Sequence, residues 1–226
     1  MKKILIIASH PDDEVLGCGA TIAKLNKIGY EIFAIILGKG KTSRNLISKK
    51  ELKILNQETN NSSKILGIKE LINFDFPDNK FDSVPLIDIV KKIESVKKEI
   101  EPEIIFTHHF GDINIDHQIT YKAVITATRP MMNEPVKEIY SFEVPSSTEW
   151  GGFDKNNYFI PNVFIDVSDT IDIKIKAMAE YKSELREYPH PRSLQYIKDL
   201  AKINGARVGL QYSENFYLVR ALRNII

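Results

Sequence analysis

The chain has 226 residues, of which 43% are hydrophobic and 27% are charged; this composition is ordinary for a globular protein, and the length suits one well-buried domain spanning residues 1–226. Its formal net charge of +1, with no block of like charge, argues against a surface for nucleic acid or anionic membranes. The only cysteine, Cys18, cannot form an internal disulfide, which suits a reducing compartment. The apolar run before His10 is too short for a signal peptide, and no stretch approaches the roughly 20 apolar residues that span a bilayer. We therefore expect a cytoplasmic protein without a membrane span.

The first part of the chain alternates short apolar runs with amphipathic segments. The apolar runs predict strands over residues 3–8, 32–37, 71–74 and 104–107. The apolar spacing and the positions of Gly and Pro predict helices over residues 14–28, 48–66 and 85–99, and a fourth from His117 toward Arg129. Such an alternation favours right-handed βαβ units around a parallel sheet.

Beyond Pro130 the alternation weakens. Strands are expected over residues 139–144, 163–167 and 212–219, and helices over residues 170–186 and 194–204. The predicted fold class is α/β, a Rossmann-like three-layer sandwich with a mostly parallel central sheet.

Histidine and aspartate cluster directly after two of the predicted strands. The first cluster is Ser9-His10-Pro11-Asp12-Asp13-Glu14, and the second runs from His108-His109 to Asp116-His117. In an open parallel sheet, ligands bind beyond the carboxyl ends of the strands. Imidazole nitrogens and carboxylate oxygens are the donors that a catalytic zinc uses. The pattern therefore favours a metal-dependent hydrolase.

The spacing within the clusters suggests a ligand set. His10 and Asp13 lie three residues apart at a strand-to-helix turn, so both side chains can reach one ion, and His117 is the natural third ligand. A fourth position would stay open to water, whose pKa zinc can lower to roughly 7. Asp12, near the ion but not bound to it, is the candidate general base.

Structural interpretations of the same residues stay open when each is taken alone. A histidine after a strand can cap a loop, and Asp12-Asp13-Glu14 can be no more than the acidic first turn of a helix. Asp-Asp-Glu also resembles the acidic metal motif of nucleotide-sugar glycosyltransferases, but the preceding His-Pro fits that class poorly. The occurrence of both clusters at strand ends favours a functional site.

With these motifs the sequence resembles the LmbE-like, or PIG-L, deacetylases, which are zinc-dependent enzymes that remove acetyl groups from substrates containing N-acetylglucosamine. The resemblance covers nearly the whole chain, in Ser9–Gly19, Asp116-His117 through Arg129-Pro130, residues 145–150 and residues 188–193. It implies Zn²⁺, or else Fe²⁺ or another divalent ion, on His10, Asp13 and His117, with Asp12 as general base. It also implies a homo-oligomer, either a trimer or a hexamer.

The resemblance suggests substrate contacts as well. Arg44 follows the second strand, where family members place an arginine that grips the sugar, and such a side chain can make bidentate contacts to hydroxyls or phosphate. A solvated loop arginine is the alternative. Asp78, next to Asn79 in the loop after the third strand, would set sugar specificity together with Arg44.

One departure from the family concerns proton transfer. Several members carry a histidine three residues before the zinc histidine, whereas this chain has Asn114, whose amide can donate to an oxyanion but cannot transfer a proton at neutral pH. His190, between Pro189 and Pro191, is the candidate general acid. The alternative is that Asp12 passes its own proton to the leaving amine.

Four further residues keep two interpretations each. One of His108 and His109 is expected to line the site or support a ligand, and the other to be structural. Cys18 is expected to be a small packed side chain rather than a nucleophile, because no base is placed for it. Trp150 either stacks on a sugar ring or packs in the core.

The expected function is hydrolysis of the N-acetyl group of an N-acetylglucosamine-type amino sugar or its conjugate, such as a glycolipid, a thiol-glycoside or a nucleotide-linked sugar. One rival is a metal-dependent amidase acting on a non-sugar amide. Another is a non-catalytic sugar- or nucleotide-binding module of the same fold, against which the intact set of His10, Asp12, Asp13 and His117 argues.

Overall fold

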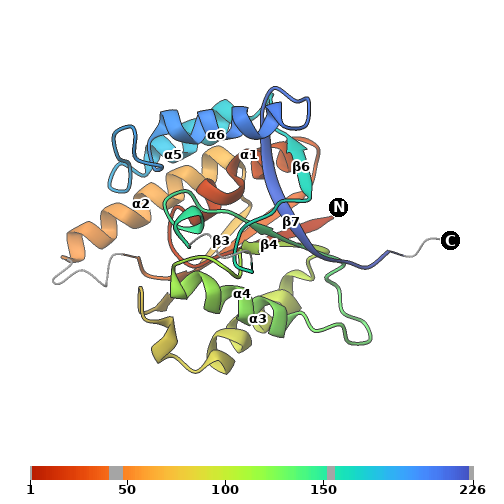
Figure 1. The fold of residues 1–226 in the computed structure, drawn as a ribbon. Helices are drawn as coiled ribbons and strands as arrows, with labels where there is room; N and C mark the ends of the chain where they lie inside the picture. The colour runs from red at the N-terminus through yellow and green to blue at the C-terminus, as the bar shows by residue number, and fades with distance from the viewer. Residues whose placement is uncertain (1, 41–47, 152–155, 224–226) are drawn as a thin grey trace.

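The computed structural model describes residues 2–40, 48–151 and 156–223, whose strands form one seven-stranded sheet (Figure 1). The strand order is β3-β2-β1-β4-β5-β7-β6. The strands are β1 (Lys3–Ala8), β2 (Glu31–Gly38), β3 (Glu70–Phe76), β4 (Ile104–His108), β5 (Glu138–Phe142), β6 (Val163–Asp166) and β7 (Ser213–Ala221). Strands β1 to β5 pair in parallel, while β7 runs antiparallel to both of its neighbours. The predicted mostly parallel sheet is confirmed.

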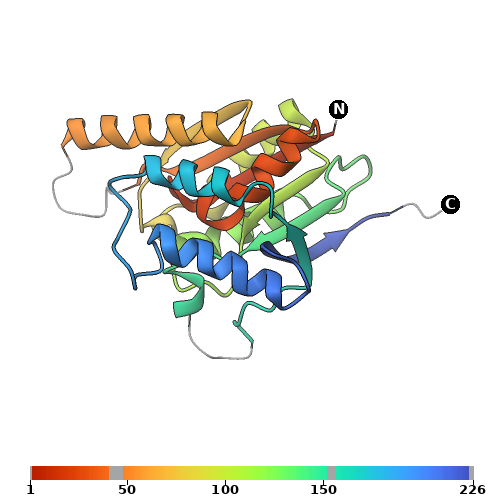
Figure 2. The ribbon, with the colours of Figure 1, turned by 90° about the horizontal axis from the view of Figure 1, so that it is seen from above.

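Helices cover both faces of the sheet, which gives the three layers that the sequence predicts (Figures 1 and 2). One face carries α1 (Asp13–Lys27), α2 (Lys49–Leu66), α5 (Ile171–Glu180) and α6 (Leu194–Ala206). The other carries α3 (Leu86–Ile100) and α4 (Ile115–Ala127). Two short 3₁₀ helices, Phe81–Ser83 and Thr148–Trp150, lie in loops. Among the described helices, none is both long and apolar enough to cross a membrane.

Strand β1 explains why the sequence shows a continuous apolar run there. Ile4 and Ile6 belong to the core that includes side chains of α1, α2, α5 and α6, whereas Leu5 and Ile7 belong to the core on the side of α3 and α4. All four are fully buried. A strand buried on both faces has no polar face to alternate with. The sheet centre therefore holds the carboxyl end of β1 rigidly.

The ends of the helices agree with the sequence in one case and differ in another. Helix α2 begins with a capping box between Ser48 and Glu51 and ends at Gly67, which takes a left-handed conformation (φ 77°) as a C-terminal stop. The predicted helix over residues 170–186 is too long, because α5 ends at Glu180. The next residue, Tyr181, leaves the helix with ψ 56°, and its fully buried side chain anchors the chain at this point.

Candidate active site

The site lies at the carboxyl ends of β1 and β4, which are adjacent parallel strands. His10 lies in the loop after β1, and Asp13 is the first residue of α1. The loop after β4 leads to His117 in the first turn of α4. The turn between β1 and α1 is tight. Asp12 has a positive φ of 102°, and the backbone N–H of His10 donates to Asp13 Oδ2 at 2.8 Å. The backbone N–H of Asp12 in turn donates to Glu14 Oε2 at 3.1 Å. These contacts fix where Asp12 and Asp13 point.

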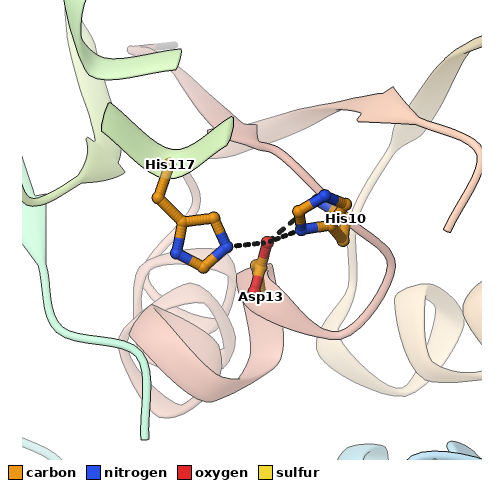
Figure 3. A group of neighbouring side chains, drawn as sticks. All are labelled: His10, Asp13 and His117. Atoms are coloured by element: carbon orange, nitrogen blue, oxygen red, sulfur yellow. Dashed lines mark hydrogen bonds and ion pairs between the residues drawn. The ribbon is translucent and has the colours of Figure 1, made fainter. Parts of the chain in front are cut away.

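The three predicted ligands come together around one carboxylate oxygen (Figure 3). His117 Nε2 lies 3.2 Å from Asp13 Oδ2, and His10 Nδ1 lies 3.4 Å from the same atom. One donor atom from each residue falls within 4.8 Å of the other two. The other carboxylate oxygen, Asp13 Oδ1, is buried and accepts no hydrogen bond from any described residue. Two imidazole nitrogens and one carboxylate with an unused buried oxygen fit a divalent ion well.

In each of the two histidines, the ring nitrogen that points away from Asp13, here called the outer nitrogen, lies close to a second carboxylate. His10 Nε2 lies 2.9 Å from Asp116 Oδ2, and His117 Nδ1 lies 3.1 Å from Asp112 Oδ2. A proton on each outer nitrogen leaves the inner nitrogen of each ring free for an ion, an arrangement common around metal-binding histidines. Asp116 and Asp112 therefore orient the candidate ligands, a role that the sequence analysis missed.

The outer carboxylates are themselves held by several donors. Asp116 accepts hydrogen bonds from the backbone N–H of Asn79 at 2.6 Å and of Phe81 at 2.9 Å. Asp112 accepts from the hydroxyls of Ser147 and Thr148, the latter at 2.7 Å. Hydrogen bonds to Asp116 and Asp112 thereby connect the loops after β3 and β5 to the two histidines.

The same carboxylates raise the proton affinity of the histidines. Burial lowers the pKa of His10, but its hydrogen bonds with Asp116 and Asp13 outweigh this and raise the pKa to about 10. Burial likewise lowers the pKa of His117, whereas Asp13 and Asp112 raise it to about 9. The carboxylates around His10 and His117 thus favour a positive charge at these two rings. Either protons or a divalent cation can supply that charge.

A second group of possible ligands, His10, Asp78 and Asp116, lies on the outer side of the His10 ring. Asp78 Oδ1 is 3.2 Å from His10 Nε2. Both oxygens of Asp116 already accept backbone hydrogen bonds, and His10 is common to the two groups. The group of His10, Asp13 and His117 is therefore the better-suited ligand set.

A cavity of about 140 Å³ opens beside the ligand group. Its walls are His10, Pro11, Asp12, Gly40, Leu55, Asp78, Asn79, Asn114, Glu184 and Arg192. Asp12 is only 2% exposed, and burial raises the pKa of its carboxyl group well above the ordinary range, although the nearby guanidinium of Arg192 opposes this. The arrangement brings a base of raised proton affinity to the wall of a polar cavity.

Arg192 lines the cavity, and the sequence analysis assigned it no role. Its Nη1 lies 3.2 Å from Asp12 Oδ2 and 3.2 Å from Glu184 Oε2, and its Nε donates to Ser146 Oγ at 2.8 Å. The only sequence signal was its place within the segment 188–193 that resembles the family.

Of the three predicted substrate contacts, two line the cavity and the third falls outside the described residues. Asp78 and Asn114 both line the cavity. Asn114 is also the N-cap of α4, because its Oδ1 accepts from the backbone N–H of Asp116 at 2.9 Å while its amide donates to Asn79 Oδ1 at 3.2 Å. Arg44 belongs to the segment 41–47, which lies outside the described residues.

His190 is not among the residues that line the cavity. Its Nδ1 accepts the backbone N–H of Arg192 at 3.0 Å, and its ring lies edge-on to Trp150 with centroids 5.9 Å apart. Trp150 is 52% exposed, which does not agree with a place in the core. In this structure His190 supports the turn that presents Arg192.

His108 and His109 have separate structural surroundings. His108 Nε2 accepts the backbone N–H of Ser9 at 2.9 Å, and its ring stacks on that of His117 with centroids 3.9 Å apart. His108 therefore packs against the candidate ligand His117, and burial lowers the pKa of His108 well below its ordinary value. His109 Nε2 lies 2.8 Å from the carbonyl oxygen of Asn157, and the ring packs against Phe159. Neither histidine lines the cavity.

The fold and the site together define a class of protein: an α/β protein with a candidate metal centre at the carboxyl ends of its central parallel strands. The model of the PIG-L family, described as GlcNAc-PI de-N-acetylase, matches residues 5–128, more than half of the chain. The chain belongs to this family.

Individual proteins agree with this assignment. The chain is 30% identical over 188 residues to the uncharacterized deacetylase YaiS of Escherichia coli, covering 80% of this chain and 91% of that one. It is 27% identical over 237 residues to the diacetylchitobiose deacetylase of Thermococcus kodakarensis, covering 97% and 84%. Among solved structures, the 4-carboxy-2-hydroxymuconate hydratase GalB of Pseudomonas putida superimposes with a TM-score of 0.76 at 20% identity, covering both chains completely. That likeness concerns the fold alone.

Proposed function

We propose that the protein is a metal-dependent N-deacetylase that hydrolyses the acetamide of an N-acetylglucosamine-type amino sugar or its conjugate. The observation that carries the proposal is the position of Asp12: its carboxylate lies on the cavity wall next to the group of His10, Asp13 and His117 without belonging to it. Family membership and the deacetylase relatives add weight. The fold alone would not decide the reaction, since one fold hosts several chemistries.

His10, Asp13 and His117 would hold the metal, for which we propose Zn²⁺, with Fe²⁺ as the alternative that two histidines and one carboxylate also suit. When bound, such an ion polarises a carbonyl oxygen and lowers the pKa of water. The second carboxylates, Asp112 and Asp116, keep the two imidazoles in the tautomers that ligation needs.

Asp12 would perform the proton transfers. Because burial raises its pKa, the carboxylate is a better proton acceptor than an exposed aspartate. It would take the proton of the attacking water and pass it to the leaving nitrogen, which releases acetate and a free amine. This assignment fits the cavity better than a general acid at His190, because Asp12 lines the cavity and His190 does not.

The remaining walls would bind the substrate. Asp78, Asn79 and Asn114 offer amide and carboxylate groups suited to sugar hydroxyls and to an oxyanion. The cavity of about 140 Å³ is smaller than the ~300–1,000 Å³ typical of small-molecule sites. It therefore suits the reacting acetamide and part of a ring. A role of Arg44 at the sugar remains part of this proposal.

A second cavity would take the rest of a conjugate. It measures about 450 Å³ and is lined by Pro11, Gly38, Lys39, Leu52, Asn56, Asn73, Phe74 and Asp75. Pro11, in the loop after β1, lines both cavities. Asn56, Asn73 and the ion pair between Lys39 and Asp75 make this second cavity polar but nearly neutral, as a hydroxylated group requires.

We include a cytoplasmic location and a trimeric or hexameric assembly in the proposal. The lone cysteine supports the location, since Cys18 is buried and has no partner cysteine. The assembly rests on the family resemblance, and light scattering of the purified protein measures it.

The test is a free-amine assay over a panel of N-acetylated amino sugars and N-acetylated amino acids, run with metal analysis of the same preparation. We expect about one divalent ion per chain and turnover confined to the sugars. Turnover of acetyl-amino acids instead would favour the non-sugar amidase. Metal-replete protein that deacetylates no member of the panel would favour the binding module.

A further inference from the structure

Helix α1 is made of two helical pieces joined at Cys18. That residue has φ −147° and ψ 22°, far from helical values. The first piece is little more than one turn, and it carries Asp13. Gly17, directly before the break, lies against the ring of Phe142 so closely that an added Cβ would be 2.3 Å from its Cδ2 atom. The turn that carries the candidate ligand is therefore not continuous with the rest of α1.

A buried ion pair occupies the break. Glu214 of β7 accepts the backbone N–H of Ala20 at 3.1 Å and of Thr21 at 2.6 Å, so its carboxylate caps the start of the second piece. Lys174 of α5 donates to the carbonyl oxygen of Leu16 at 2.8 Å, at the end of the first piece. The two side chains meet at 2.6 Å and are only 6% and 5% exposed.

The contact with Leu16 reaches the candidate ligand through one helical turn. The backbone N–H of Leu16 donates to the carbonyl oxygen of Asp12 at 2.9 Å, so residues 12 to 16 move together. The hydroxyl of Tyr181, the residue that caps the end of α5, donates to Glu14 Oε1 at 2.6 Å. Lys174 and Tyr181 thus contact the same turn from the interior and the C-terminal end of α5.

Stability alone explains such a pair poorly. Well-packed apolar side chains of similar volume often replace a buried ion pair without loss of stability. What apolar side chains cannot supply is a donor for the Leu16 carbonyl and acceptors for the amides of Ala20 and Thr21. Directed contacts of this kind specify geometry.

We propose that Lys174 and Glu214 are positioning residues that set the orientation of the Asp13 turn and thereby the affinity of the site for a divalent ion. The inference rests on the proposed metal site. It adds two residues that belong neither to the group of His10, Asp13 and His117 nor to the walls of the cavity of about 140 Å³ beside it. Lys174 lies in α5, and Glu214 lies in β7, between β5 and the edge strand β6.

The test is the double variant Lys174→Met with Glu214→Leu, which removes both charges and leaves neither unpaired. Because the Leu16 carbonyl and the Ala20 and Thr21 amides lose their side-chain partners, we expect the melting temperature to fall, with the protein still folded at the temperature of the binding measurement. Its dissociation constant for Zn²⁺, measured by competition with a chelator, should rise about 10–100-fold, as when outer contacts of metal ligands are removed.

The chain offers a matched control on the opposite face of the sheet. Lys97 of α3 donates to the carbonyl oxygen of Ala127 at 2.6 Å and to Glu134 Oε2 at 2.6 Å, and its side chain is 12% exposed. The double variant Lys97→Met with Glu134→Leu has the same chemistry but is remote from α1. Its affinity for Zn²⁺ should equal that of the wild type.

Hydrogen exchange of the metal-free proteins gives a second readout. The amides of residues 14 to 17 should exchange faster in the Lys174/Glu214 variant than in the control variant. If the apolar pair does not fold, the isosteric pair Lys174→Met with Glu214→Gln takes its place, with the same expected direction.

Unchanged Zn²⁺ affinity in a folded Lys174/Glu214 variant, with tight binding in the wild type, would overturn this inference alone. A parallel loss of affinity in the control would overturn it too, because the effect would then be one of general stability. A wild-type protein that binds no divalent ion would refute the proposed function first and this inference with it. None of these measurements requires the acetylated substrate.

Discussion

Arg192 holds Asp12 from the far side of the turn, with Nη1 at 3.2 Å from Asp12 Oδ2. The guanidinium is itself held by Glu184 and Ser146. A buried carboxyl group next to a fixed guanidinium is held in one position on the cavity wall. The relationship connects the segment after α5 with the loop after β1.

The first prediction concerns this contact. Arg192→Met should lower kcat by about tenfold or more, because the carboxylate of Asp12 loses its orienting partner, while the metal content stays near one equivalent. Steady-state kinetics and metal analysis measure the two effects. Arg186→Met is the control, since Arg186 donates only to nearby backbone carbonyls of the same segment. Equal kcat in both variants would rule out a role of Arg192 in the reaction.

The second prediction separates proton transfer from metal binding. Asp12→Asn should keep the metal, because Asp12 is not in the ligand group, but should lose about 10²–10⁴-fold in turnover, the usual contribution of a general base. In contrast, His10→Ala should no longer bind a stoichiometric ion. Near-normal turnover of the Asp12 variant would exclude this residue as the base.

The third prediction concerns the outer carboxylates. Asp116→Asn removes the charge that orients His10 and should weaken metal binding about 10–100-fold. Asp82→Asn, at an exposed position of the neighbouring 3₁₀ helix, is the control and should bind metal normally. Chelator competition measures both constants. If Asp116→Asn binds as tightly as the wild type, the tautomer of His10 is set by other contacts.

Asp112 and Asp116 show which parts of the site could be predicted from the sequence and which could not. The central strands were predictable because burial on both faces forces an apolar run. The proximity of His10 and Asp13 was predictable because they are close along the chain; their role as ligands stays a prediction. The sequence places Asp112 and Asp116 near His117, but only the folded loops decide which carboxylate faces which ring. Arg192 lies 180 residues after Asp12, and the contact depends on where α5 ends. That end is set by the burial of Tyr181 and not by a local stop signal.

The fourth prediction concerns stability against pH. Burial and the charge of Glu149 raise the pKa of Glu143 from 4.5 to about 7, although a hydrogen bond with Asn204 opposes this. The folded state therefore binds the proton more tightly than the unfolded state, so this contribution to stability is full below about pH 4.5 and is lost as the pH rises through about 7. Glu143→Gln stays neutral, so it should melt a few degrees above the wild type at pH 8 and close to it at pH 4.5. Thermal melts at the two pH values measure the difference, and an equal difference at both would refute the assignment.

The last prediction decides between the two candidate general acids. His190 does not line the cavity beside the candidate ligand group, and its Nδ1 accepts the backbone N–H of Arg192. Its pKa is lowered, mainly by burial and then by the charges of Arg192 and Arg186. A histidine in this place stabilises a turn and has no direct path to the substrate nitrogen. We therefore expect His190→Gln to lose less than about tenfold in kcat, well below the loss expected for Asp12→Asn. Gln can replace the acceptor atom, whereas His190→Ala removes it and should lower kcat further by loosening Arg192. The comparison of the two variants thus distinguishes support of Arg192 from proton donation: a general acid would make both variants equally slow, and a positioning residue would be partly rescued by Gln. Equal and large losses in both, with the metal retained, would return the general-acid role to His190.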